Sequence, residues 1–209
     1  MKKLLASLTI LTILALPLGS AAFAEQQTPS IDLSVEEVHG NIPAQADAAQ
    51  AMYPAVHSLV LAMTENDLEY APEDSEFLWT SLYYMLSLYG QMDERAEFTD
   101  DTMILPSEMV RDYAAALYPD VAQLPEIPTP ISQRIAYFAS DDSYHLARGD
   151  EALIQVTVDD TQTQDNGQVI LSGRMTALED GSTLYTFQST LSPRDTMFGF
   201  IIDSLTISA

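Results

Sequence analysis

Apolar side chains recur at intervals of three and four residues in the first half of the chain, the pattern of amphipathic helices. The clearest helix is predicted at residues 74–89, where Asp74 or Ser75 supplies an N-cap and Gly90 marks the end. Its apolar positions include Leu78, Leu82, Met85 and Tyr89. Because apolar residues occur on most sides of this helix, we expect it to lie in the core.

Two further helical stretches are predicted on either side of it. Residues 41–68 are rich in alanine, but Pro54 lies inside them. An internal proline removes a hydrogen-bond donor and clashes with the preceding turn, so we expect two shorter helices there. A last helix is predicted at residues 107–118, with Ser107 as its N-cap.

Alternation of apolar and polar residues replaces the helical pattern in the second half, and it predicts β-strands. At residues 152–158, for example, Ile154 and Val156 alternate with polar side chains. The strands are predicted at residues 134–138, 144–146, 152–158, 169–178, 183–191 and 197–207. Turn sequences rich in Asp, Asn, Gly and Pro separate them, which favours an antiparallel meander.

A proline-rich joint at residues 124–130 separates the two halves. Its prolines recur every two or three residues, and this spacing excludes both a helix and a central strand. The sequence therefore predicts an α+β fold with a helical half at residues 41–118 and a β half at residues 131–208. In this fold the N-terminal helices pack on a C-terminal antiparallel β-meander.

The start of the chain has the features of a removable export signal. Lysines precede an apolar run at residues 4–18, and small residues of the kind that signal peptidase recognises end at Ala24. We expect a signal peptide at residues 1–24 and a single domain at residues 25–209. The mature domain is then secreted, or placed in the periplasm or cell envelope. No later segment is apolar enough to predict a membrane span.

The charge of the chain is strongly negative, with 8 basic and 31 acidic residues and a formal net charge of −23. Lys2 and Lys3 are the only lysines, so removal of the signal peptide would lower this charge from −23 to −25. Nucleic-acid binding is excluded because it requires basic patches, and anionic membrane surfaces are disfavoured for the same reason. The acidity favours solubility, or attraction of divalent cations or a cationic partner. The chain has no cysteine, so its stability must come from core burial.

Aromatic segments carry a resemblance to known proteins. They are Phe77-Leu-Trp-Thr-Ser-Leu-Tyr-Tyr, Tyr137-Phe-Ala-Ser-Asp-Asp-Ser-Tyr, and the ending from Tyr185-Thr-Phe to Phe198-Gly-Phe-Ile-Ile-Asp-Ser-Leu. Together they resemble a group of uncharacterised exported proteins of Gram-positive anaerobic bacteria, which implies export but no activity. The order of helices followed by a meander also resembles NTF2-like domains, which implies a curved sheet and helices that form a cone. NTF2-like domains include both enzymes and binding modules, so this resemblance does not choose between them.

Catalytic and cofactor-binding motifs are missing from the sequence, among them G-x-S-x-G, H-E-x-x-H, the P-loop and G-x-G-x-x-G. Among the histidines, His145 is the best catalytic candidate because Asp141 and Ser143 closely precede it. On a strand, Ser143 and His145 share one face. Residues this close on one strand rarely have the geometry of a Ser-His-Asp site, however.

A calcium site is the main metal-binding hypothesis. One predicted hairpin connection contains the candidate ligands Asp159, Asp160, Asp165 and Asn166. Calcium takes about six to eight oxygen ligands, which closely spaced carboxylates and amides in a loop supply. The alternative is that Asp and Asn populate this connection because they favour turns and tolerate left-handed backbone.

Aromatic side chains supply the last candidate site, a ligand pocket between the helices and the sheet. Its predicted lining includes Trp79, Tyr83, Tyr113, Tyr137 and Tyr185. Tyrosines in a pocket would suit a sugar, a peptide or an apolar small molecule. The alternative is that these rings simply fill the core.

These observations favour an exported, acidic binding or interaction module without enzymatic activity. Its partner is then an unknown small ligand or an extracellular protein. An NTF2-like enzyme with a pocket that includes His145 is the first alternative, and an envelope protein supported by calcium is the second.

Overall fold

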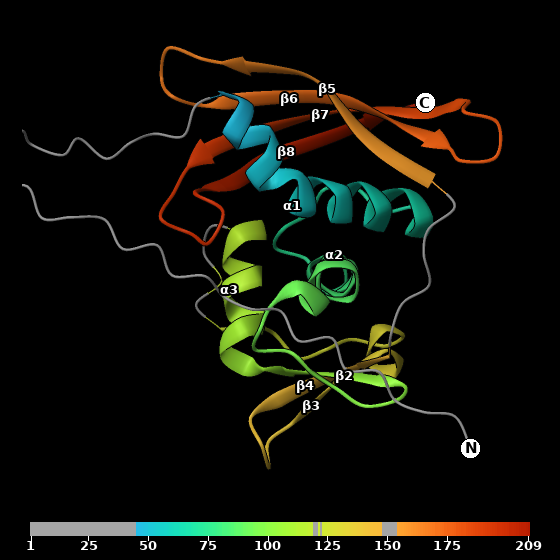
Figure 1. The fold of residues 1–209 in the computed structure, drawn as a ribbon, viewed down its shortest axis with the longest axis vertical. Helices are drawn as coiled ribbons and strands as arrows, with labels where there is room; N and C mark the ends of the chain where they lie inside the picture. The colour runs from blue at the N-terminus through green and yellow to red at the C-terminus, as the bar shows by residue number, and fades with distance from the viewer. Residues whose placement is uncertain (1–44, 119–120, 122, 148–153) are drawn as a thin grey trace, which may run out of the picture. The chain divides into compact units, whose positions relative to one another are not determined.

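The computed structural model describes residues 45–118, 121, 123–147 and 154–209, and residues 40–209 form one structural unit. The predicted signal peptide lies outside the described residues. Within this unit the helices lie between two antiparallel sheets, a larger one of strands β5–β8 and a smaller one of β1–β4 (Figure 1). The predicted α+β class, with N-terminal helices and a C-terminal meander, is confirmed at this level.

Helix α1 spans Gln45–Asn66 without a break, although Pro54 lies inside it. The expected division into two helices is therefore wrong. Apolar side chains on both sides of the proline, including Met52 and Leu59, are fully buried. Since they enter one core only if the helix continues, their burial offsets the hydrogen bond that the proline cannot make.

Helix α2 spans Ser75–Tyr89 and is buried along most of its length, as its sequence predicts. The Asp74 side chain accepts hydrogen bonds from the backbone N–H groups of Glu76 and Phe77, which makes it the N-cap. A short 3₁₀ turn, η1 (Gly90–Met92), follows it directly.

Helix α3 spans Ser107–Leu117, as predicted, but Ser107 does not cap it. The N-cap position belongs to Pro106, and Ser107 is the first helical residue. The Ser107 backbone N–H instead donates to the carbonyl oxygen of Asp142, 2.9 Å away. This bond attaches the start of α3 to the hairpin that follows much later in the chain.

The larger sheet contains β5 (Ile154–Thr163), β6 (Val169–Ala177), β7 (Thr183–Pro193) and β8 (Phe200–Ser208) in sequence order. All neighbours pair antiparallel, so the predicted four-stranded meander is confirmed. Its inward face packs on the helices. At one point of contact the Tyr53 hydroxyl of α1 donates to the Val156 carbonyl oxygen of β5, 2.9 Å away.

Close packing on the inward face of this sheet depends on Gly173. In β6 this residue lies opposite Phe187 of β7. A Cβ at position 173 would overlap the Thr157 carbonyl oxygen and would lie 2.5 Å from Cζ of Phe187. The aromatic ring therefore occupies the space that any other residue at this position needs.

The smaller sheet differs from the prediction. It contains β1 (Glu97–Phe98), β2 (Thr102–Pro106), β3 (Ile135–Phe138) and β4 (Ser143–Ala147) in the order β1-β2-β4-β3. Strands β3 and β4 were expected, but β1 and β2 arise inside the predicted helical half. The hairpin therefore joins strands from that half and does not extend the C-terminal meander. Two separate sheets do not confirm the single curved sheet that the NTF2-like resemblance implies.

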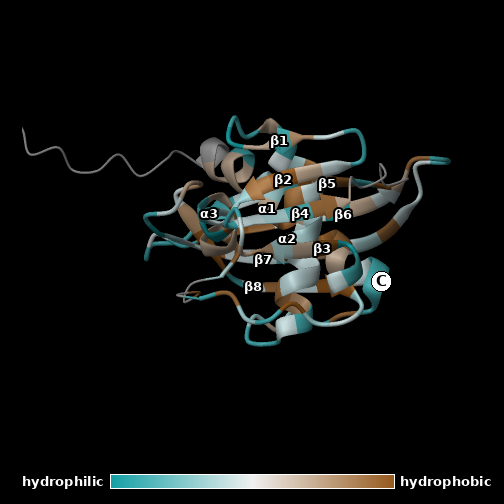
Figure 2. Cartoon of the chain, turned by 90° about the horizontal axis from the view of Figure 1, so that it is seen from below, coloured by the Kyte–Doolittle hydropathy of each residue, from teal (hydrophilic) through white to brown (hydrophobic). Residues whose placement is uncertain are grey.

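The hydrophobic core fills the space between the two sheets. Figure 2 shows hydrophobic colour on the strands and helices, whereas the loops that join them are largely hydrophilic. The largest fully buried side chains come from the helical layer, among them Trp79, Phe77 and Met52, and from both sheets, among them Phe200 of β8 and Met103 of β2. The core therefore runs through the helical layer and contacts both sheets.

One histidine lies within this helical layer. The His57 Nδ1 atom of α1 is 2.5 Å from the hydroxyl oxygen of Tyr89 at the end of α2. Burial lowers the pKa of His57 to about 4 and raises the pKa of Tyr89. The hydroxyl therefore stays protonated, and it donates a hydrogen bond to Nδ1 of the neutral imidazole.

We expect the free energy of unfolding to fall as the pH drops from about 6.5 to about 4, because the unfolded histidine binds a proton that the folded one resists. The depressed pKa of His57 accounts for a loss of about 3 kcal/mol at most. Urea unfolding at several pH values, compared with the variant His57→Gln, isolates this contribution from that of the carboxylates. Parallel stability curves for the two proteins would contradict the prediction.

Candidate functional site

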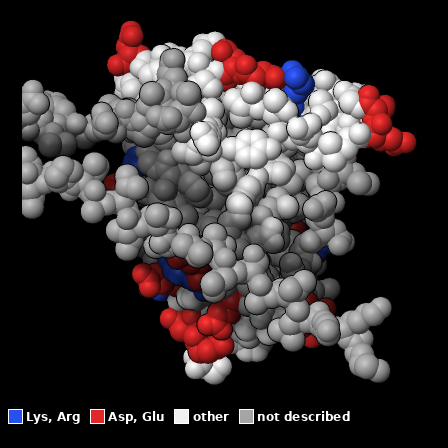
Figure 3. Space-filling view, in the orientation of Figure 1, with Lys and Arg blue, Asp and Glu red and all other residues white. Residues whose placement is uncertain are grey.

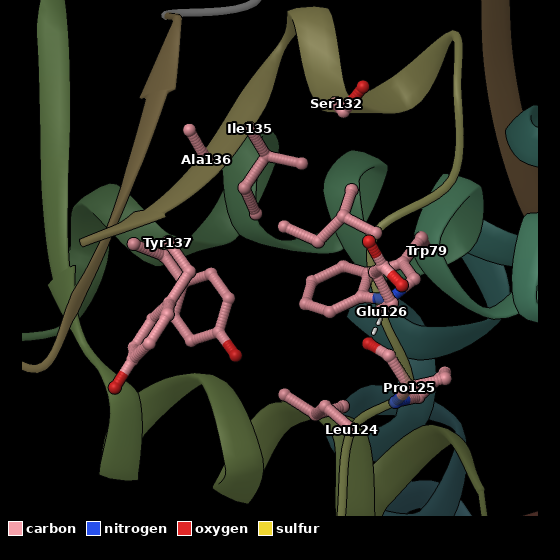
Figure 4. Close-up of a pocket in the computed structure, with 10 residues that line it drawn as sticks. Trp79, Leu124, Pro125, Glu126, Ser132, Ile135, Ala136 and Tyr137 are labelled. Carbon is pink, nitrogen blue, oxygen red and sulfur yellow. Dashed lines mark hydrogen bonds between the residues drawn. The ribbon is translucent and has the colours of Figure 1, made fainter. Parts of the chain in front are cut away.

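A pocket of about 490 Å³ opens between α2, the proline-rich joint and strand β3. Its lining residues are Trp79, Leu124, Pro125, Glu126, Ile127, Ser132, Ile135, Ala136, Tyr137 and Tyr144. Figure 4 shows Tyr137 on one side of the hollow and Trp79 with Glu126 on the other. Pockets of this volume with mainly apolar walls and a few polar groups are typical ligand sites.

The inner wall of the pocket is fixed by Trp79. Its indole ring is fully buried, and its Nε1–H group donates to the Pro125 carbonyl oxygen, 3.0 Å away (Figure 4, dashed line). Because α2 positions the ring rigidly, this bond holds the proline-rich joint at a fixed distance from the helix. The 3₁₀ turn η2 (Ile131–Gln133) then leads the chain into β3.

Two tyrosines form the opposite wall. Tyr137 of β3 and Tyr144 of β4 lie opposite each other in the hairpin, with ring centroids 5.0 Å apart. Tyr144 also lies beside Trp79, at a centroid distance of 5.5 Å. The Tyr137 side chain is about half exposed, and its hydroxyl donates to Oδ1 of Asp142, 2.8 Å away. This bond orients the exposed ring at the mouth of the pocket.

The charge of the pocket is negative. Glu126 is the one charged residue in its lining, and it is exposed. Asp142 lies beside the rim through its bond to Tyr137; that bond raises the pKa of the Tyr137 hydroxyl, and nearby Arg111 offsets part of the effect. Acidic side chains also outnumber basic ones on the face drawn in Figure 3. A positively charged group is therefore favoured at this site over a negative one.

The residues around His145 form a separate cluster on the outer side of the same hairpin. The Nε2 atom of His145 lies 3.4 Å from Oδ2 of Asp141 and 3.1 Å from Oγ of Ser143. A Ser-His-Asp site requires the carboxylate and the hydroxyl on different ring nitrogens. Here the same nitrogen, Nε2, contacts both the Asp141 carboxylate and the Ser143 hydroxyl. The imidazole ring also packs on Phe138, with ring centroids 4.2 Å apart. His145 does not line the pocket described above.

The predicted calcium ligands are not gathered in one loop. Strand β5 continues to residue 163, so Asp159 and Asp160 lie within the sheet, and Asp159 forms an ion pair with Arg174 at 2.7 Å. Asp165 and Asn166 lie in the tight turn beyond the strand. Among the residues that the structure describes, no three His, Cys, Asp or Glu side chains are placed to hold a metal ion. Calcium binding stays a prediction without a formed site to support it.

Of the predicted pocket aromatics, the structure brings Trp79 and Tyr137 together and places the others elsewhere. Tyr83 packs near the guanidinium group of Arg134, 5.6 Å from its ring centroid. Tyr113 of α3 packs against Phe198 at 6.2 Å, and Tyr185 lies on β7 in the larger sheet. Of the predicted set, only Trp79 and Tyr137 therefore line this pocket.

Sequence reasoning missed Tyr144, Glu126 and the other residues of the proline-rich joint. A signal for Tyr144 was present, because the hairpin turn after Phe138 places Tyr144 directly opposite Tyr137. The joint was expected to be neither a helix nor a central strand, but its sequence carries no sign of what it lies against. That information comes from the contact with Trp79.

Comparisons of the chain with protein-family models, with curated proteins and with solved structures found no match. The site must therefore be interpreted from its own geometry. Among the described residues, none of the helices combines the length and the apolar character needed to cross a membrane.

Proposed function

We propose that this protein is an exported binding module whose pocket beside Trp79 takes an amphipathic ligand with an apolar group and a positive charge. The observation that supports this proposal is the pocket itself, with aromatic walls and Glu126 as the charged residue of its lining. Catalysis at His145 has less support, because its neighbours do not form a relay. Export itself is inferred from the sequence.

The physical basis is a combination of two weak attractions in one concave site. Aromatic and aliphatic walls remove the apolar part of a ligand from water, at roughly 25 cal/mol for each Å² that is buried. The tyrosine faces and the Glu126 carboxylate attract a cation. They do not favour anionic ligands such as phosphates and carboxylates. A net charge of −23 further raises the local concentration of cations.

Trp79 provides a direct test because it is the only tryptophan of the chain and forms a pocket wall. We expect benzyltrimethylammonium to change its fluorescence in a saturable way, and phenylacetate to have little effect at matched ionic strength. Glu126→Gln should weaken binding of the cation up to about fivefold, which corresponds to the upper value of about 1 kcal/mol for an exposed charge pair.

Two controls complete this test. Benzyl alcohol, which has no charge, should bind equally to the parent protein and to Glu126→Gln. The variant Glu94→Gln makes the same charge change outside the pocket lining, so it should leave cation binding unchanged. A linear, non-saturable fluorescence response that is identical in all variants would refute the proposed function.

A further inference from the structure

Strand β3 is an edge strand of the smaller sheet, and one side of its backbone faces the pocket. The hydrogen bond from the Ala147 N–H to the Arg134 carbonyl oxygen, 3.0 Å, fixes which residues bond to β4. In an antiparallel pair the bonded residues alternate, so Arg134, Ala136 and Phe138 face β4. The backbone groups of Ile135 and Tyr137 must then point away from it.

These outward backbone groups have no partner within the described part of the chain. Neither the N–H nor the C=O of Ile135 or Tyr137 takes part in a hydrogen bond there. Ile135 is buried and anchors the strand, whereas Tyr137 is 47% exposed. A strand edge of this kind is a template for pairing with another extended chain.

The pocket lies beside β3, and its lining includes residues 124–127 of the joint. The bond from Trp79 to the Pro125 carbonyl oxygen attaches this part of the joint to α2. Residues opposite each other on neighbouring strands point their side chains to the same face. A residue that paired with Tyr137 would therefore direct its side chain inward, toward Trp79 (Figure 4).

We propose that the ligand of this pocket is an extended peptide that adds as a further strand to the free edge of β3. An apolar or aromatic side chain of the peptide enters the pocket, and flanking lysine or arginine residues meet the acidic rim at Glu126 and Asp142. This inference rests on the proposed function, and it adds that backbone hydrogen bonds to Tyr137 provide part of the affinity.

The probe is the peptide acetyl-KTVFVTK-amide, which alternates in polarity, carries one central aromatic residue and contains no tryptophan. We expect it to change the Trp79 fluorescence and to bind more tightly than acetyl-ETVFVTE-amide. N-methylation of alternate residues separates strand addition from simple pocket filling. Because only every second N–H of an added strand faces β3, methylation of one alternate set should weaken binding at least tenfold, and methylation of the other set should have little effect.

Variants of the protein test the same edge from the other side. Tyr137→Pro removes the outward N–H without disturbing the bonds between β3 and β4, which Ala136 and Phe138 make. Tyr137→Val also removes the aromatic ring but keeps the N–H, so it is the matched control. We expect the proline variant to bind the peptide at least tenfold more weakly than the valine variant, while both bind benzyltrimethylammonium alike.

The outcomes separate this inference from the proposed function. If both N-methylated peptides bind as well as the parent peptide, strand addition is wrong, although a pocket that binds benzyltrimethylammonium survives. If neither ligand binds, the proposed function fails as well. If the protein instead forms a dimer that Tyr137→Pro abolishes, a second copy occupies the edge and the peptide proposal is overturned. The peptide experiment decides the question even if the proline variant fails to fold.

Discussion

Replacement of Trp79 by alanine should lower the free energy of unfolding by roughly 3–5 kcal/mol, the range for truncation of a large buried aromatic side chain. The ring is fully buried between α2 and the smaller sheet, and it packs on Tyr144. Its loss also leaves the Pro125 carbonyl oxygen without its donor. The joint then loses its attachment to α2, so ligand binding should be lost as well.

Urea unfolding followed by circular dichroism measures this effect, because the variant has no tryptophan to report by fluorescence. Leu184→Ala, at an exposed position of β7, is the control and should change the stability by less than about 0.5 kcal/mol. Trp79→Phe keeps an aromatic ring but loses the Nε1–H group. Its free energy of unfolding should therefore fall between those of Trp79→Ala and the parent protein. Equal stability of Trp79→Ala and the parent would show that the ring does not hold the joint.

Replacement of Gly173 by alanine should cost roughly 3 kcal/mol, at the upper end of the usual range for overpacking. The added methyl group would meet the carbonyl oxygen of Thr157, which is part of the backbone, and the ring of Phe187. The ring can rotate away only into the core. The backbone oxygen can move only if the pairing of β5 with β6 shifts.

The neighbouring position supplies the control. Ser172 points to the outer face of the same strand, so Ser172→Ala should change stability by less than about 0.5 kcal/mol. A double variant, Gly173→Ala with Phe187→Leu, tests the cause, because a smaller side chain should recover part of the loss. Thermal unfolding of the four proteins measures both effects, and an unchanged melting temperature for Gly173→Ala would contradict the packing argument.

Local sequence patterns predicted the elements that are long or made of consecutive hairpins. The period of apolar residues and the cap at Asp74 were sufficient for α2. Alternation and turn residues were sufficient for the four strands of the larger sheet. Strand β2 escaped prediction because it is short, and because its main partner β4 lies about forty residues further along the chain. Pro54 misled the prediction because tertiary packing outweighed its local cost.

The candidate site was predicted less completely than the fold for a related reason. Trp79 and Tyr137 were identified as aromatic candidates, but residue type alone does not separate a ring at a pocket wall from one in the core. Tyr113 and Tyr185 illustrate this limit, since they have the same chemistry and pack elsewhere. The free edge of β3 depends on the strand order of the smaller sheet, and no local pattern contains that order.

The pairing of β2 with β4 also sets an order for the appearance of function during folding. The larger sheet has low contact order, because each strand pairs with the next, and such topologies form quickly. The smaller sheet closes a loop that contains α3 and the whole proline-rich joint, so it carries a larger entropic barrier. The pocket needs Trp79, the joint and β3 together. Binding should therefore appear as a late kinetic event, after most secondary structure has formed.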